Sequence, residues 1–245
     1  MNKLSPLAAL IAAAVITPAV AEEAASDKLW TGEVTLNYSE SSGNTESSLF
    51  SGKSKAVREG LQWRNTFKLE GDNETAEDAD GVETRTAEKY FASAKADYKV
   101  TQKSFLFGLL EYTDDRFSGY DYETSVTFGY GRQLIDTPAH NLKADIGPGY
   151  RRSEVEDTGD VQEEGLVRVG AQYVWTINEN ATFDEDFSSE VGEDKTVTKS
   201  LTRLKVKING NLWGSISYEI KHTDEVPPGI KNSDRKTLLG LNYTF

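Results

Sequence analysis

The side chains that most often perform nucleophilic and acid–base chemistry are scarce in this sequence. It contains two histidines, His140 and His222, and no cysteine, so disulfides and thiolate metal sites are excluded. His222 stands in the run KHTD at 221–224, which lacks the His-x-Ser spacing of barrel lipases and lipid A deacylases. A catalytic imidazole needs a nucleophile within hydrogen-bond reach, and Ser200 on a neighbouring strand is the remaining candidate. We expect no catalytic residue, and keep a lipid-modifying hydrolase near His222 as the alternative.

Carboxylates are abundant, but they are too many to single out a catalytic pair. Asp and Glu total 40 against 27 Lys and Arg, which gives a formal net charge of -13. This balance excludes a general nucleic-acid-binding protein, because binding to phosphates needs a basic surface. Two acidic runs, at 72–83 and 154–164, do not follow the spacing of an EF-hand, so we expect only weak binding of divalent cations there and no dedicated metal site. No glycine-rich phosphate loop is present, and we expect no cofactor.

The first 21 residues have the pattern of a targeting segment. Lys3 supplies a short positive region, an apolar run follows, and Ala19-Val20-Ala21 is typical of a cleavage site. We therefore predict a signal peptide over 1–21 and a mature domain over 22–245 that is exported through the periplasm. The apolar run is too short to span a bilayer, and hydrophobic residues make up only 37% of the chain, which excludes a helical membrane protein.

Beyond residue 28, apolar side chains recur at every second position. Val34, Leu36 and Tyr38, for example, alternate with Thr35 and Asn37. A period of two indicates β-strands with one apolar and one polar face. Twelve strands are predicted, at 28–39, 47–58, 60–71, 86–99, 104–113, 120–133, 142–152, 165–175, 181–190, 197–208, 211–222 and 235–245.

These strands favour a closed membrane barrel over a soluble β-sandwich. They are about 10 residues long, as a tilted membrane strand requires, and aromatic side chains such as Trp30 and Trp175 stand at strand ends. Long and short connections tend to alternate, as in outer-membrane barrels with short periplasmic turns and longer external loops. An even strand count places both termini on the periplasmic side. The predicted fold is therefore an all-β antiparallel transmembrane barrel.

The C-terminal strand resembles the assembly signal of bacterial outer-membrane barrels, because apolar residues alternate up to a final aromatic. Its signal residues are Leu239, Leu241, Tyr243 and Phe245. The motifs SGNT at 42–45 and VPPG at 226–229, with this ending, make the mature chain resemble the family of salt-induced outer-membrane proteins, domain-of-unknown-function family 481. The resemblance implies a barrel in the outer membrane, which the barrel assembly machinery would insert among lipid and lipopolysaccharide. It implies no defined molecular activity. Our function hypothesis is a non-enzymatic narrow channel or structural envelope protein linked to salt or osmotic stress.

If the apolar faces contact lipid, the polar faces line a lumen that is rich in both signs of charge. Ion pairs could fill and rigidify a narrow lumen, or the charges could line a small aqueous channel and set its selectivity; a barrel of about twelve strands allows both. The residues that we predict to line the lumen are Arg64, Lys68, Lys95, Glu111, Asp121, Glu123, Arg168, Lys199, Arg203, Lys205, Lys207 and Glu219.

Two residues fit a twelve-stranded barrel poorly. Pro148 lies inside a predicted strand, where it removes a ladder hydrogen bond and implies a bulge or an earlier strand end. Glu185 falls on the lipid-facing side between Phe183 and Phe187, where a charge is costly near the bilayer midplane. Either the strand at 181–190 ends early or the barrel has ten strands.

Overall fold

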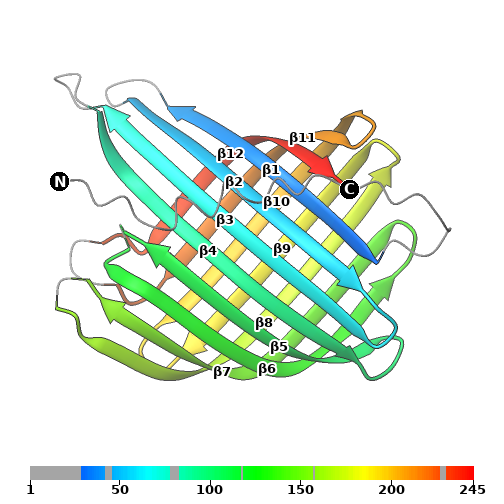
Figure 1. Cartoon of the computed structure of the whole chain (residues 1–245), viewed down its shortest axis with the longest axis horizontal. Helices are drawn as coiled ribbons and strands as arrows, with labels where there is room; N and C mark the ends of the chain where they lie inside the picture. Colours follow the sequence, from blue (N-terminus) through cyan, green and yellow to red (C-terminus); the bar gives the residue numbers. More distant parts are fainter. Residues whose placement is uncertain (1–28, 42–45, 78–82, 117, 157, 227–229) are drawn as a thin grey trace.

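The fold is a single closed barrel of antiparallel strands (Figure 1). The structure, a computed structural model, describes residues 29–41, 46–77, 83–116, 118–156, 158–226 and 230–245. The predicted signal peptide and the SGNT motif lie outside these ranges, as does most of VPPG. No helix in the described part of the chain is long and apolar enough to cross a membrane.

Twelve strands form the barrel, as the alternation predicts, and each pairs with its neighbour in sequence. β1 and β12 close the barrel, with Val34 opposite Tyr243 and Leu36 opposite Leu241. The strands are β1 (Trp30–Ser41), β2 (Glu46–Glu59), β3 (Trp63–Glu77), β4 (Glu83–Lys99), β5 (Ser104–Asp115), β6 (Tyr120–Asp136), β7 (His140–Val155), β8 (Val161–Asn178), β9 (Ala181–Gly192), β10 (Thr196–Asn209), β11 (Leu212–Thr223) and β12 (Ser233–Thr244).

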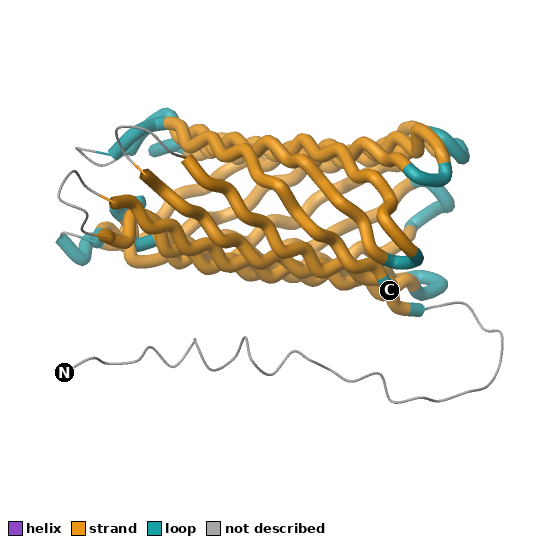
Figure 2. Tube along the Cα trace, turned by 90° about the horizontal axis from the view of Figure 1, so that it is seen from above, coloured by secondary structure: helices purple, strands orange, loops and turns teal. Residues whose placement is uncertain are grey.

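The two ends of the barrel differ. At one end, which we name the terminal end, β1 begins, β12 finishes, and short turns join β2–β3, β4–β5, β6–β7, β8–β9 and β10–β11 (Figure 2). The connections at the opposite end, the loop end, include the longer β3–β4 and β11–β12 segments.

The apolar side chains face outward and the polar ones face the lumen. Leu36 and Tyr38 are 53% and 49% exposed, whereas their neighbours Thr35 and Asn37 are 3% exposed. In a β-sandwich the apolar faces would be the buried ones, so this arrangement excludes that alternative. Outward aromatic rings also pack together towards the terminal end, where Trp63 contacts Tyr98 with ring centroids 5.1 Å apart.

The expectation that Pro148 would cause a bulge or end its strand is wrong. β7 continues through Pro148, which pairs with Val167 of β8 without a register shift. On the β6 side, pairing stops at Thr127–Gly149 and resumes at Tyr130–Ile146 in the same register, so the missing N–H falls in a gap of the ladder. The neighbouring backbones are unusually close there: a Cβ on Gly147 would lie 2.0 Å from the carbonyl oxygen of Phe128.

Glu185 does lie on the outer face, yet β9 is a complete strand and the ten-strand alternative is wrong. Two hydroxyl groups of β10 donate to its carboxylate: Ser200 Oγ at 2.7 Å and Thr202 Oγ1 at 2.5 Å. These bonds compensate part of the desolvation of the carboxylate, which is why the strand tolerates it.

Candidate functional site

Among the residues that the structure describes, two cavities lie in the lumen. A central cavity of ≈ 260 Å³ extends from Arg64 and Lys143 near the terminal end to Asp115 and Lys221 near the loop end. A second cavity of ≈ 570 Å³ lies at the loop end, against the described part of the β11–β12 connection. The six residues that line both cavities are all charged and lie on two opposite arcs of the wall, which we name the charged junction: Lys89, Asp115 and Glu123 on β4–β6, and Lys221, Asp234 and Lys236 on β11 and β12.

Ion pairs cross the lumen between strands that are not neighbours in the barrel. Lys95 of β4 reaches Asp145 of β7 at 2.6 Å, and Lys236 of β12 reaches Asp72 of β3 at 2.9 Å. These pairs tie separate parts of the barrel wall together across the lumen. Further pairs of this kind include Lys53–Glu219, Lys68–Asp186 and Lys221–Asp115.

A compact cluster of charges narrows the terminal end. Arg203 and Lys205 of β10 both bind Glu33 of β1, at 2.7 and 3.0 Å, and both bind Asp184 of β9, at 3.2 and 2.9 Å. The four side chains are each about 15% exposed, so water reaches them. A charge in such a site is stable because each partner satisfies another.

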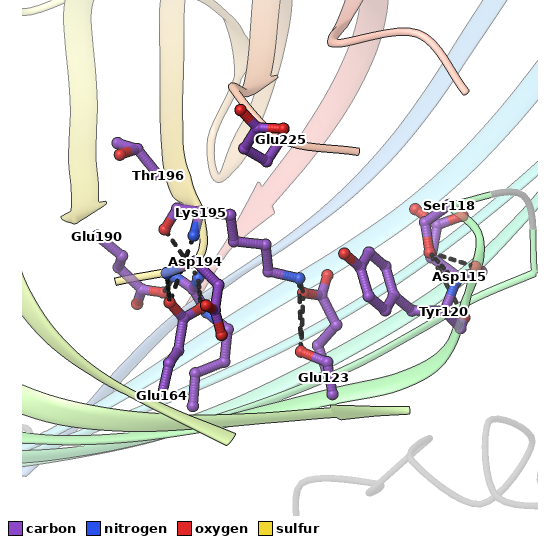
Figure 3. Close-up of polar contacts among 12 residues, drawn as sticks. Asp115, Ser118, Tyr120, Glu123, Glu164, Glu190, Asp194, Lys195, Thr196 and Glu225 are labelled. Carbon is purple, nitrogen blue, oxygen red and sulfur yellow. Dashed lines mark hydrogen bonds and ion pairs between the residues drawn. The ribbon is translucent and has the colours of Figure 1, made fainter. Parts of the chain in front are cut away.

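At the loop end, the β9–β10 connection places Lys195 in the lumen (Figure 3). The Lys195 ammonium is 2.5 Å from Glu123 of β6 and 3.6 Å from the ring centroid of Tyr120. Glu164 of β8 holds the connection, since its Oε2 accepts the backbone N–H groups of Asp194 (2.8 Å) and Lys195 (3.4 Å). We name this arrangement the Lys195 latch.

Arg151 anchors the Lys195 latch to the wall. Its guanidinium binds Glu164 at 2.7 Å and Glu190 at 2.8 Å, and its side chain is 3% exposed. Two buried carboxylates on either side of one guanidinium give a rigid, hydrogen-bonded unit.

One part of the inner wall is apolar, which the sequence reasoning missed. Phe105, Phe107 and Leu109 of β5 are buried on the lumen side, and the Lys95 ammonium is 4.6 Å from the ring centroid of Phe107. Phe105 fits because the facing residue is glycine: a Cβ on Gly131 would lie 2.2 Å from this ring. The sequence signal that could have revealed this apolar wall is the run SFLFGLL at 104–110, which has apolar residues on both faces of the strand.

Most of the predicted lumen residues lie in the lumen. Arg203 and Lys205 belong to the terminal-end cluster, while Lys207 is exposed at the rim, with its ammonium 5.7 Å from the ring centroid of Trp213. Asp121 does not line either cavity: it is exposed at a register irregularity between Tyr120 and Tyr122. The central cavity is lined by Arg64, Lys68, Lys95, Glu111, Glu123, Arg168, Lys199 and Glu219.

The acidic runs at 72–83 and 154–164, which lie between the predicted strands, are in large part strand. β3 extends to Glu77, so Asp72 points into the lumen and pairs with Lys236. β8 begins at Val161, so Glu164 is buried against Arg151. The described residues hold no group of three or more His, Asp or Glu side chains placed to bind a metal ion.

His222 contacts a different serine from the one considered. Its Nδ1 lies 2.8 Å from Ser233 Oγ, across the β11–β12 pair and on the exposed outer face. Ser200 instead donates to Glu185.

The four proposed assembly-signal residues share the outer face of the last strand. Leu239, Leu241 and Tyr243 are each more than half exposed, and Phe245 follows β12. Phe245 closes the seam with β1, since its backbone N–H donates to the carbonyl of Gly32 at 3.0 Å.

Comparisons with known proteins agree with this architecture. A family profile described as "Protein of unknown function, DUF481" matches residues 34–245. The uncharacterized protein YdiY of Escherichia coli strain K12 is 29% identical over 225 residues, which cover 91% of this chain and 86% of that protein. Two solved structures share the fold at low identity. The NanC porin has a TM-score of 0.52 at 13% identity, covering 86% of this chain and 98% of that one. The COG4313 outer membrane channel from Pseudomonas putida F1 has a TM-score of 0.51 at 10% identity, covering 91% and 100%.

Proposed function

The chain belongs to the DUF481 family of proteins of unknown function, and we propose that it is a non-enzymatic channel of the bacterial outer membrane for water and small ions. The observation that carries this proposal is the charged junction, the six charged side chains shared by the central and loop-end cavities. Rings of charged side chains act as selectivity elements in narrow pores. The ion pairs that cross the lumen would restrict passage to small solutes.

An outer-membrane location is supported by the outward apolar face and the aromatic contacts at its edge. We infer that the terminal end faces the periplasm and the loop end faces the exterior, as in barrels with short periplasmic turns. The outward residues of β12, which end at Tyr243 and Phe245, would be recognised by the barrel assembly machinery. Lipid and lipopolysaccharide would surround the outer face.

The crossing ion pairs also support a link to salt stress. Exposed and half-exposed ion pairs weaken as ionic strength rises, because the Debye length falls from about 10 Å at 0.1 M to about 3 Å at 1 M. The terminal-end cluster, at about 15% exposure, is open to this screening. High salt would therefore loosen the ion pairs at the terminal end of the lumen.

Planar-bilayer recording of the purified full-length barrel tests the proposal. We expect small, discrete conductance steps that grow more than linearly with salt concentration. The variant Arg203→Gln with Lys205→Gln should conduct more than the wild-type protein at low salt. A barrel that is folded in the bilayer and gives no steps at any voltage would refute the channel.

The hydrogen bond between His222 and Ser233 is the one observation that favours a hydrolase. Incubation with labelled phospholipid and lipopolysaccharide tests this alternative. We expect no turnover; turnover that is lost in both His222→Ala and Ser233→Ala would establish the enzyme in place of the channel. Turnover that persists in both variants would indicate a contaminating activity.

A further inference from the structure

The seam that closes the barrel is incomplete at the loop end. The pairing of β1 with β12 stops at Tyr38–Leu239. Yet β1 continues to Ser41, paired with β2, and β12 begins at Ser233, paired with β11. The described strands therefore leave a gap between the edges of β1 and β12 that is open towards the loop end. We name this gap the seam notch.

The edge of β12 at the seam notch presents backbone groups that have no partner among the described strands. Gly32 and Phe245 exchange two backbone hydrogen bonds across the seam, at 3.1 and 3.0 Å. In an antiparallel pair, every second residue of a strand directs its N–H and C=O to the same neighbour. Counted from Phe245, the residues of β12 that direct theirs into the seam notch are Ser233, Arg235 and Thr237. Free N–H groups at the edge of a sheet can bind anions.

The loop-end cavity lies directly behind the seam notch. Its lining follows β12 residue by residue from Ser233 to Thr237, and it includes Ser39 of β1 on the other side of the gap. The cavity therefore borders both edges of the seam notch. No described strand separates it from the outside at this place.

Basic groups gather at the seam notch. The lining of the loop-end cavity carries six basic side chains against four acidic ones, and three of the six are Lys231, Arg235 and Lys236, on β12 or just before it. Lys236 pairs with Asp72 at 2.9 Å, whereas Lys231 and Arg235 form no ion pair with another described residue. Asp234 faces inward, opposite β11. A guanidinium and an ammonium beside free N–H groups favour a phosphate.

The outer face is apolar where the seam notch begins. Tyr38 and Leu239 lie opposite each other at that point, and Leu36 and Leu241 are the next outward pair towards the terminal end. All four side chains are 49% exposed or more. The Tyr38 hydroxyl donates to Glu40 at 3.2 Å, on the outer side of the seam notch. An acyl chain that lies along this apolar strip would leave its head group level with the seam notch.

We propose that the seam notch admits the anionic, phosphate-bearing head group of a lipid from the side into the loop-end cavity, while the acyl chains stay on the apolar outer face. Arg235, Lys231 and the free N–H groups of the β12 edge bind the phosphate. The inference goes beyond the proposed channel, because it needs the barrel in a membrane but does not need a conducting lumen.

Cross-linking from inside the cavity tests the seam notch in the full-length barrel. The chain has no cysteine, so the variant Ser47→Cys, in the lining of the loop-end cavity, carries a single benzophenone label. The labelled barrel is placed in phosphatidylcholine vesicles that contain phosphatidylglycerol, illuminated and analysed by mass spectrometry. We expect phosphatidylglycerol adducts in excess of the share of this lipid in the vesicles. Adducts that only follow the lipid composition would overturn the proposal, whether or not the variants below fold.

Two charge variants separate the seam notch from the rest of the surface. Lys231→Gln with Arg235→Gln should lower the yield of phosphatidylglycerol adduct about tenfold, which is the effect of losing one charge-assisted hydrogen bond. Arg152→Gln removes an exposed, outward arginine from β7 and should leave the yield unchanged. Thr237→Trp keeps every charge but places a bulky ring at the edge of the seam notch, so it should also lower the yield. Equal yields in all three variants would overturn the proposal.

Two other ligands are distinguished by the same label. Free glycerol phosphate, added to barrels in pure phosphatidylcholine vesicles, tests a soluble anion: an adduct with it, and none with phosphatidylglycerol, would overturn entry from the membrane. A cross-linked dimer in place of lipid adducts would show that a second copy covers the β12 edge. Planar-bilayer recording is independent of these results. Adducts from a barrel that does not conduct would remove the channel and leave the seam notch, and conductance without adducts would do the reverse.

Discussion

Replacement of Arg151 by methionine should destabilise the barrel far more than the same change at Arg152. Arg151 is 3% exposed and binds both Glu164 and Glu190. Removing one partner of a buried ion pair costs about 3–5 kcal/mol, because the remaining charge is left without compensation. Glu164 retains the two backbone N–H donors of the Lys195 latch. We therefore expect the lower end of the range, about 3 kcal/mol.

Arg152 is a control of the same chemistry at the next position. It points outward, its side chain is 50% exposed, and it lies 3.3 Å from a Glu163 carboxylate that is 47% exposed. An exposed pair of this kind contributes little to stability, because water and salt screen the two charges. The two variants remove the same group from the same strand. A difference between their free energies of unfolding therefore measures the effect of burying the ion pair.

Urea unfolding in lipid vesicles, followed by tryptophan fluorescence, gives the free energy of unfolding of each variant by linear extrapolation. A second variant, Arg151→Met with Glu190→Gln, should recover part of the loss because it removes one uncompensated charge. The reasoning fails if Arg151→Met and Arg152→Met differ by less than about 1 kcal/mol, since the buried unit would then contribute no more than a surface pair.

Three further predictions concern other parts of the barrel. Gly129→Ala should lower the free energy of unfolding by about 1–3 kcal/mol or more, because its Cβ would lie 2.2 Å from the carbonyl oxygen of Ile146. Gly165→Ala is the control: it places its Cβ in open space and should leave that free energy nearly unchanged. Equal free energies of unfolding for the two variants would contradict the prediction. Lys195→Met should raise single-channel conductance, because it removes the ammonium from Glu123; unchanged conductance would show that the Lys195 latch does not obstruct the pore. The backbone N–H of Thr196 donates to Asp224 and holds the pKa of that carboxyl below its ordinary value of 3.8. This contact should protect the Thr196 amide from hydrogen exchange at neutral pH, and the protection should weaken as the pH falls through the lowered pKa. The pH dependence should vanish in Asp224→Asn.

The strands could be predicted because lipid imposes a period of two on every one of them. Their ends could not, since beyond the apolar belt both faces are polar and the alternation disappears. β8 was predicted over 165–175 and extends over Val161–Asn178. This difference is why Glu164 was assigned to a loop although it lies against Arg151.

The lumen charges were visible in the sequence, but their partners were not. Pairs such as Lys95–Asp145 join strands that are not neighbours in the barrel, and which residues meet depends on the tilt and stagger of the closed barrel. Lys195 was missed for a related reason. It belongs to a short acidic connection, and its inward position depends on backbone donors that reach Glu164, which is 31 residues earlier in the chain.

The two charged clusters at the ends of the lumen should respond differently to salt. Both use cations shared between two carboxylates, but the Arg151 side chain is 3% exposed, whereas Arg203 is 15% exposed. Mobile ions screen charges that water reaches and have much less effect on buried pairs. Rising ionic strength should therefore loosen the Arg203 cluster at the terminal end while the Arg151 unit still anchors the Lys195 latch. A lumen built in this way would change its permeability with salt without losing its fold.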